Sequence, residues 1–138
     1  MKIKKLIDDL IIPKKAYKND AGFDVYAPYD IWLFKGEFKQ IKLGFAVEIN
    51  NNEVCIMSER SGMAINYGIT SIGNIIDAGY RGEISIILLN TGQNDYYINK
   101  GNKIGQMLIL QLGDQNIELK NELSATERDL RAHFSSGV

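Results

Sequence analysis

The sequence predicts an all-β domain with the architecture of a sandwich or a barrel. Apolar runs of strand length recur along the chain, and short clusters of Gly and Asn residues that are typical of turns separate them. Strands at this spacing favour a sandwich or barrel over alternating βαβ units, because only one short stretch has a helical pattern.

The expected strands follow one another from the middle of the chain onward. At residues 45–49 apolar positions alternate with other residues, which indicates a half-buried strand. Three later runs are rich in apolar residues: 53–57, 84–89 and 104–110. The turn signals lie at 35–36, 50–52, 90–92 and 100–102. The helical stretch is expected at residues 63–67, directly after a Ser-Gly pair.

The composition predicts one compact domain and excludes several classes of protein. A chain of 138 residues is long enough to bury a core without disulfides or a structural metal. Cys55 and His133 are its only cysteine and histidine, so a disulfide within the chain and a zinc site are not expected. Its 16 basic and 17 acidic residues are nearly balanced, which does not indicate a nucleic-acid partner.

The hydropathy pattern gives no sign of a membrane partner. No apolar run reaches about 18 residues, the length that a membrane span requires. The basic N-terminus is not followed by the apolar region of a signal peptide. We therefore expect a soluble protein of the cytoplasm, or of the host cytoplasm if the gene is viral.

Three segments differ from ordinary strand or turn sequence. They are residues 21–25, 59–63 and 75–84. Each places charged or polar side chains beside glycine, and glycine allows a backbone to approach a phosphate group closely. The segments therefore indicate a site for a phosphate-bearing ligand.

These segments and two others resemble, in order, the five motifs of the trimeric dUTPase family. The matching residues are 21–25, Arg60-Ser61-Gly62, 76–82, 101–107, and 126–128 with 135–138. The third motif, Ile-Asp-Ala-Gly-Tyr-Arg-Gly, is the most specific, and the resemblance covers nearly the full chain. Five motifs in the family's order are a much stronger signal than any one of them.

The resemblance implies a jelly-roll-like β-clip fold and a homotrimer with shared active sites. Residues 1–125 would form the β domain, and residues 126–138 a flexible arm that closes over the ligand. The implied reaction is hydrolysis of dUTP to dUMP and pyrophosphate, which limits uracil incorporation into DNA and supplies dUMP for dTTP synthesis.

Within the third motif, the resemblance implies that Asp77 is the general base and that Tyr80 packs against the deoxyribose. Hydrolysis of a phosphoanhydride needs a group that takes the proton of the attacking water, and a carboxylate can do so. A ring against the sugar would exclude the 2′-hydroxyl of UTP. Judged by residue type alone, Asp77 is an ordinary turn residue.

The other motifs are expected to bind the phosphates and a metal ion. Arg60 supplies a charged guanidinium group with several N–H donors, and Ser61 supplies a hydroxyl. Gly62 supplies a backbone N–H group and Gln106 a side-chain amide. Asp24 is expected to act through water on a Mg²⁺ ion that the substrate phosphates hold for the most part, because magnesium keeps much of its hydration.

The chain departs from the family pattern at several positions near this site. The hairpin at residues 69–80 is expected to read uracil through its backbone, with Asn74 and Ile76 among the substrate contacts. Asn74 stands where glycine is expected, Ser71 where many relatives have asparagine, and Glu59 where relatives have proline. Because a carboxylate near phosphates is unfavourable, Glu59 should point away from them or pair with a basic group.

The C-terminal arm lacks most of the glycines of the family pattern, so two alignments of it remain open. Phe134 is favoured as the ring that stacks on uracil, with His133 as the alternative. Either Arg128 or Arg131 would bind the γ-phosphate. Ser135 and Ser136 are further expected substrate contacts.

Three other functions are compatible with parts of the sequence. A dCTP deaminase or a bifunctional deaminase–diphosphatase would share the fold, but Tyr80, the Arg60-Ser61-Gly62 turn and the arm argue against it. A non-catalytic nucleotide-binding module is disfavoured by the intact Asp77. A sandwich domain that binds other macromolecules would require the five ordered motifs to be a coincidence.

Overall fold

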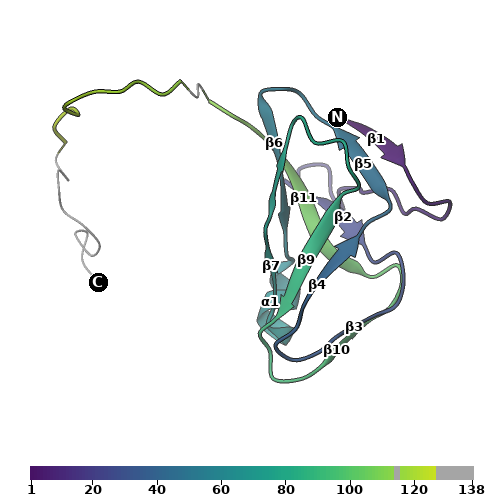
Figure 1. Ribbon diagram of the computed structural model, residues 1–138. Helices are drawn as coiled ribbons and strands as arrows, with labels where there is room; N and C mark the ends of the chain where they lie inside the picture. Colours follow the sequence, from purple (N-terminus) through teal and green to yellow (C-terminus); the bar gives the residue numbers. More distant parts are fainter. Residues whose placement is uncertain (114–115, 127–138) are drawn as a thin grey trace.

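The computed structural model of the chain describes residues 1–113 and 116–126 (Figure 1). Its elements, in chain order, are β1 (Lys2–Lys5), β2 (Phe23–Tyr26), β3 (Ile31–Leu33), β4 (Phe38–Lys42), β5 (Phe45–Glu48), β6 (Glu53–Ser58), α1 (Ser61–Tyr67), β7 (Ile69–Ile72), β8 (Ile75–Asp77), β9 (Ser85–Asn90), β10 (Tyr96–Ile98) and β11 (Lys103–Gln111). The predicted all-β class is confirmed.

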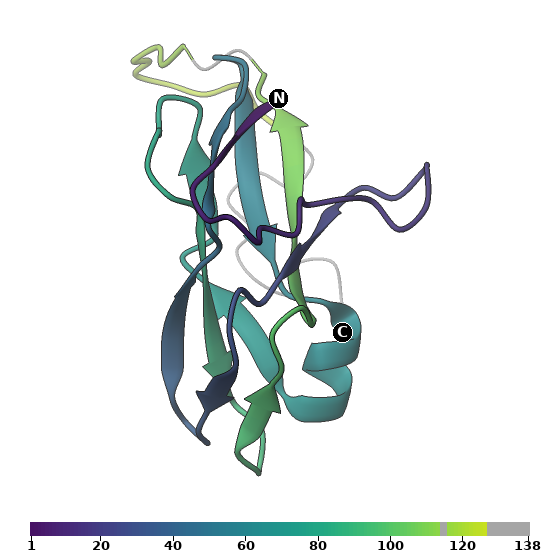
Figure 2. The ribbon, with the colours of Figure 1, turned by 90° about the vertical axis from the view of Figure 1, so that its right-hand side faces the viewer.

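Two antiparallel sheets form the body of the molecule. One has the strand order β2-β11-β6-β8, and the other has the order β4-β9-β7. Two short antiparallel pairs, β1-β5 and β3-β10, lie beside them. Figure 2 shows the sheets edge-on, with α1 at one end. All four strands predicted from apolar runs are present, with ends that differ by one residue or so.

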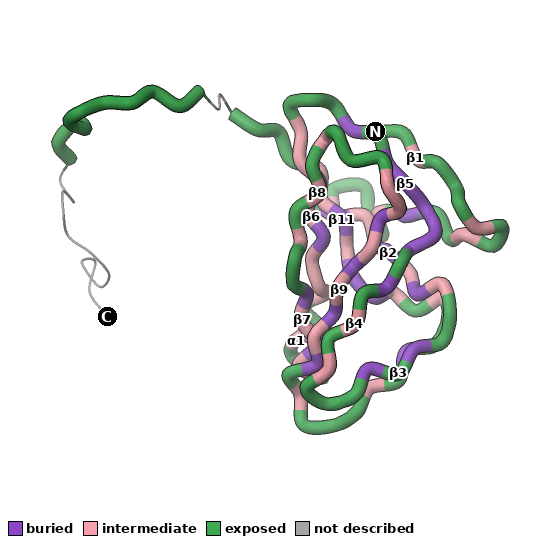
Figure 3. The backbone as a smooth tube through the Cα atoms, in the orientation of Figure 1, coloured by how far each residue is buried: buried purple, intermediate pink, exposed green. Residues whose placement is uncertain are grey.

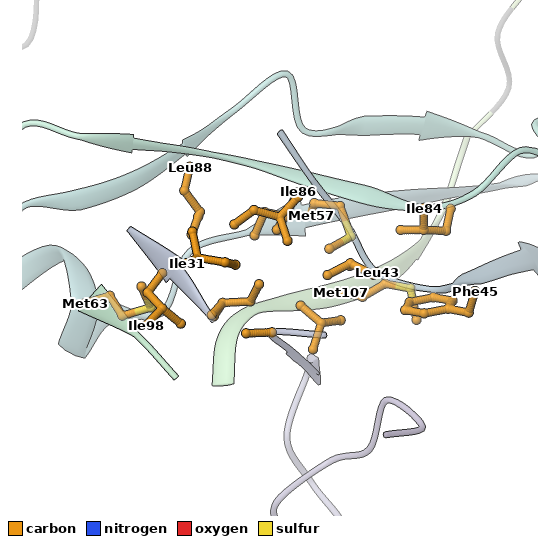
Figure 4. Close-up of a cluster of buried hydrophobic side chains, with 14 of the residues drawn as sticks. Ile31, Leu43, Phe45, Met57, Met63, Ile84, Ile86, Leu88, Ile98 and Met107 are labelled. Atoms are coloured by element: carbon orange, nitrogen blue, oxygen red, sulfur yellow. The ribbon is translucent and has the colours of Figure 1, made fainter. Parts of the chain in front are cut away.

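A single apolar cluster fills the space between the sheets. Along β9, buried and partly buried residues alternate, so that Ile86 and Leu88 point inward toward Met57 of β6 and Met107 of β11 (Figure 4). Cys55 belongs to this cluster, and burial raises the pKa of its thiol to about 11. The thiol therefore stays protonated near neutral pH, as expected for a cysteine buried in an apolar core.

The helix α1 covers the predicted stretch 63–67 but begins two residues earlier, at Ser61, and it holds the Arg60 segment at one end of β6. Met63 is its buried residue and anchors the helix to the core. The helix ends at Gly68, whose φ of 68° is left-handed. Among the described residues, no helix is long and apolar enough to cross a membrane.

Residues 116–126 run away from the body after β11 and are exposed along their length (Figure 3). Their large apolar side chains contact almost nothing in the chain: Ile117 is 99% exposed, Leu119 96% and Leu123 89%. Exposure of apolar side chains to water is unfavourable, so packing against another surface would stabilise this segment.

Candidate active site

The third motif lies on a cleft of about 260 Å³, here called the Asp77 cleft. Its lining residues come from β4, the β7–β8 hairpin and β9: Gln40, Gly73, Ile75, Ile76, Asp77, Tyr80, Glu83, Ser85 and Ile87. Asp77 ends β8, opposite Val54 of β6, and is exposed. Its carboxylate has no hydrogen-bond or ion-pair partner in the described part of the chain, so it is available to a ligand or a water molecule.

Tyr80 is fixed at the edge of this cleft by contacts within its own turn. Its backbone N–H donates to Asp77 O at 3.0 Å, and its hydroxyl donates to Glu83 O at 3.2 Å. The ring lies so close to Gly82 that a Cβ there would fall 2.4 Å from the hydroxyl oxygen. Glycine at this position therefore lets the ring fold over the turn, and the ring still remains 47% exposed.

The first, second and fourth motifs meet at a different cleft, of about 380 Å³, here called the Arg60 cleft. Its lining residues are Ala16, Tyr17, Asp20, Ala21, Gly22, Asp24, Arg60, Ser61, Lys103 and Gln106. At its centre the Asp24 carboxylate, 14% exposed, lies 2.6 Å from Lys103 Nζ and 3.6 Å from Arg60 Nε. The carboxylate thus holds two cations beside each other at the surface.

Ser61 and Gly62 follow Arg60 as the first residues of α1, and both are exposed. A Cβ at Gly62 would meet nothing within 4 Å, so the backbone there is open to approach. Gly62 also lines an adjoining cleft with Arg60 and Lys103. A hydroxyl, an open backbone and two cations form an arrangement suited to phosphate oxygens.

Gln106 joins the first and fourth motifs on β11. It pairs with Asp24 of β2 on one side and with Ser58 of β6 on the other. Its Nε2 donates to Glu59 O at 3.2 Å, which orients the amide. A Cβ on Gly22 would fall 2.4 Å from Gln106 Oε1, so the side chain of Gln106 occupies the place that any larger residue at position 22 would need.

Two of the residues that depart from the family pattern turn away from the clefts. Glu59 does not line the Arg60 cleft, and its carboxylate accepts hydrogen bonds from Ser71 instead. The expectation that Glu59 points away is confirmed, although its partner is a serine and not a basic group. Asn74 is absent from the lining of the Asp77 cleft, because its amide folds back onto its own hairpin and β6. Its contact with substrate stays a prediction.

Several lining residues were not identified from the sequence. In the Asp77 cleft these are Gln40, Glu83 and Ser85, and in the Arg60 cleft they are Tyr17 and Asp20. Gln40 lies on β4, far from every motif in sequence, and donates to Ser85 Oγ at 2.9 Å. No local signal marks it, whereas Asp20 directly adjoins a recognised motif. The predicted contacts Arg128, Phe134, Ser135 and Ser136 lie outside the described residues, as do His133 and Arg131.

Asp77 and Arg60 lie at opposite ends of β6. Asp77 pairs with Val54 near the start of that strand, whereas Arg60 follows its end. The six residue steps from Val54 to Arg60 correspond to about 20 Å at the rise of an extended strand. The Asp77 carboxylate and the Arg60 segment of one chain therefore cannot touch the same phosphorus atom.

The side chains of the Arg60 cleft suit a metal ion that is bound to phosphates and water better than one that protein side chains coordinate directly. No cluster of three or more His, Cys, Asp or Glu side chains occurs among the described residues. Asp24 is already paired with two cations, so it offers limited capacity for a direct ligand but can accept hydrogen bonds from metal-bound water. The fold and these clefts define an all-β protein built to bind a phosphate-bearing ligand.

Comparison with known proteins identifies the family. A sequence model of the dUTPase family matches residues 8–137, and the chain belongs to that family. The deoxyuridine 5'-triphosphate nucleotidohydrolase of Clostridioides difficile is 42% identical, with 99% of this chain and 97% of that protein covered.

Solved structures of phage enzymes have the same fold. The Staphylococcus bacteriophage 80alpha dUTPase with dUPNHPP is similar with a TM-score of 0.93 and 25% identity, over 99% of this chain and 98% of that one. A mutant dUTPase of phage phi11 of S. aureus, described with a structural Mg(II) ion, has a TM-score of 0.82 at 23% identity, over 88% and 96% of the two chains.

Proposed function

We propose that this dUTPase-family chain hydrolyses dUTP to dUMP and pyrophosphate, with Asp77 as the general base. The observation that carries the proposal is the exposed, unpartnered carboxylate of Asp77 in a cleft beside the ring of Tyr80. In the reaction, the water oxygen bonds to the α-phosphorus, and the bond from that phosphorus to the pyrophosphate oxygen breaks. The carboxylate takes the proton that the water loses.

The Asp77 cleft is suited to the deoxyuridine end of the nucleotide. No cation among the described residues lines it, and of its two carboxylates Asp77 is unpaired while Glu83 lies 3.8 Å from Lys42 Nζ, so the cleft offers little attraction to a triphosphate. Its walls offer the apolar face of Ile76 and the half-exposed ring of Tyr80, which are surfaces for a base and a sugar. The position of Tyr80 supports its proposed role in excluding a 2′-hydroxyl.

The Arg60 cleft is suited to the triphosphate. Arg60, Ser61, Gly62 and Gln106 present a cation, a hydroxyl, a backbone N–H and an amide on one surface. We infer that Asp24 contacts a Mg²⁺ ion through water when the substrate brings that ion in. Bound to the phosphates, magnesium would neutralise part of their charge. Without the ion, Asp24 keeps Arg60 and Lys103 oriented.

We infer that the active site is completed in a homotrimer. One chain holds its base end and its phosphate end about 20 Å apart along β6, so the two halves of one site come from different chains. Exposed apolar residues beside the Asp77 cleft, such as Ile75 at 71%, and along residues 116–126 supply surface for subunit contacts.

The C-terminal residues are proposed to close this shared site. We place the boundary of the β domain at residue 125 and assign residues 126–138 to the arm, with Arg128 and Phe134 as its ligand contacts. Deleting residues from Arg128 onward should cut activity strongly and leave the trimer intact by size measurement. Unchanged activity would show that the arm is not part of this site.

The function is tested by measuring pyrophosphate release from dUTP, dTTP, dCTP and UTP, with and without Mg²⁺. We expect dUTP to be the preferred substrate and Mg²⁺ to increase the rate. Ammonia release from dCTP would instead assign the chain to deamination. If the protein bound dUTP but did not hydrolyse it under any of these conditions, it would be a non-catalytic nucleotide-binding module.

A further inference from the structure

A single buried hydroxyl joins the segment that follows β6 to the β7–β8 turn, and both lie at the end of β6 that precedes Arg60. Ser71 of β7 is 8% exposed, and its Oγ donates to Glu59 Oε2 at 2.6 Å. The same Oγ accepts from Glu59 N at 3.1 Å and from Asn74 Nδ2 at 3.2 Å, with the amide oriented as its surroundings favour. A hydroxyl has one donor and two acceptor sites, so Ser71 uses its full capacity within this contact.

On the phosphate side, this hydroxyl fixes the residue directly before Arg60. Both the backbone N–H and the carboxylate of Glu59 are bound to Ser71, and the carboxylate also accepts from Ser71 N at 3.2 Å. The Glu59 carbonyl in turn accepts from the Gln106 amide at 3.2 Å. The chain entering the Arg60 cleft is therefore held from β7 and from β11 at once.

On the other side, the same hydroxyl fixes the hairpin that carries Asp77. Asn74 lies in the turn between β7 and β8, and its amide also reaches Ile72 O at 3.1 Å and Met57 O at 3.3 Å. Its own carbonyl accepts from Met57 N at 2.8 Å. The turn is thereby attached to β6 just before the strand that ends at Asp77.

We propose that Ser71, with Glu59 and Asn74 as its partners, is a positioning residue for both the Arg60 segment and the Asp77 hairpin. The consequence for catalysis rests on the proposed function. In the proposed trimer the Arg60 segment and the Asp77 hairpin of one chain serve different active sites. Loss of one hydroxyl would therefore loosen the phosphate half of one site and the base half of another.

The geometry of the network requires an acceptor oxygen at position 59 and does not require its negative charge. One oxygen, Oε2, receives both hydrogen bonds from Ser71. A glutamine at this position keeps such an oxygen, so Glu59→Gln should preserve the network, whereas Glu59→Ala should break it. Ser71→Ala removes the central hydroxyl, so the partly buried Glu59 loses the partner of its N–H and of its carboxylate, and the Asn74 amide loses one of its acceptors.

The first test measures amide hydrogen exchange in the ligand-free protein. In Ser71→Ala, exchange should become about tenfold faster or more in both residues 59–63 and residues 74–77. Thr70→Val is the matched control, because Thr70 is the neighbouring β7 residue and its hydroxyl has no partner in the described part of the chain. Unchanged exchange, or faster exchange in only one of the two segments, would overturn the proposal.

The second test measures the Asp77 hairpin and the Arg60 segment separately, through the binding of dUMP and of pyrophosphate. Ser71→Ala should weaken the binding of dUMP and of pyrophosphate about tenfold each. Arg60→Ala should weaken pyrophosphate alone, and Glu59→Gln neither. If Glu59→Gln and Glu59→Ala lost equal affinity for these ligands, the negative charge of Glu59 would be required, which would contradict the network. If the wild-type chain does not hydrolyse dUTP, the proposed function fails, and the exchange experiment still decides on the network.

Discussion

The Asp77 cleft and the Arg60 cleft differ in the chemical groups that they present. The Asp77 cleft has carboxylates, a tyrosine ring and apolar walls, but no cation. The Arg60 cleft has two cations around a central carboxylate, an exposed serine and an open glycine. Neither is a complete site, and β6 separates them. The difference supports the proposal that each active site is assembled from more than one chain.

The clefts also differ in how the chain builds them. The Asp77 cleft depends on a three-residue strand, a turn and the packing of Tyr80 on Gly82. The Arg60 cleft is supported by β11, the longest strand, and by the start of α1. Substitutions should accordingly act on base recognition and chemistry at one cleft and on phosphate binding at the other.

The largest effect is expected from Asp77→Asn. The change keeps the shape of the side chain and removes the proton acceptor, so kcat should fall by about 10²–10⁴-fold, the usual contribution of a general base. Binding of a non-hydrolysable dUTP analogue should remain close to wild type. Pyrophosphate release in single-turnover experiments measures the effect, and near wild-type turnover would refute the assignment of Asp77.

A smaller loss is expected from Arg60→Ala. Removing a cation that binds phosphate should lower kcat/KM for dUTP by about 10–100-fold, which corresponds to a charge-assisted hydrogen bond. Affinity for dUMP should change much less, because the base end lies in the other cleft. Titration calorimetry with dUMP and pyrophosphate measures these affinities. An equal loss of affinity for both ligands would show that the two clefts do not bind separate parts of the nucleotide.

Tyr80→Ala should reduce the discrimination between dUTP and UTP by about tenfold, because space opens for a ribose hydroxyl. Tyr80→Phe is the matched control, since it keeps the ring and removes only the hydroxyl that donates to Glu83 O. The ratio of kcat/KM values for the two nucleotides is the measurement. If the alanine variant discriminates as well as wild type, the ring does not contact the sugar.

The smallest effect concerns Glu59 and acid stability. The hydrogen bond from the Ser71 hydroxyl lowers the pKa of Glu59. A carboxyl whose pKa is lower in the folded state stabilises the fold above the ordinary pKa of glutamate, about 4.3, and loses this contribution as the pH falls through the folded value. Any difference in Tm between wild type and Glu59→Gln should therefore be constant near neutral pH and shrink in acid. A difference that does not change down to pH 3 would argue against this linkage.

Much of the fold could be predicted, because the core strands carry their own pattern. β6, β9 and β11 are long enough for apolar runs to show, whereas β3, β8 and β10 have three residues each and give no periodic signal. The motif residues were recognisable in sequence, but the division into two clefts was not, since it depends on which strands pair. Glu59, Ser71 and Asn74 stood out one by one as departures, and only the fold shows that they bind one another.

Mixing two impaired variants tests the central claim, that each active site combines Asp77 of one chain with Arg60 of another. Asp77→Asn and Arg60→Ala chains, unfolded together and refolded at equal amounts, should regain activity. Random assembly into closed trimers leaves about a quarter of the sites with both residues intact, so about a quarter of wild-type turnover is expected. Activity no higher than the average of the two separate variants would mean that each site draws both residues from one chain, and would contradict the account.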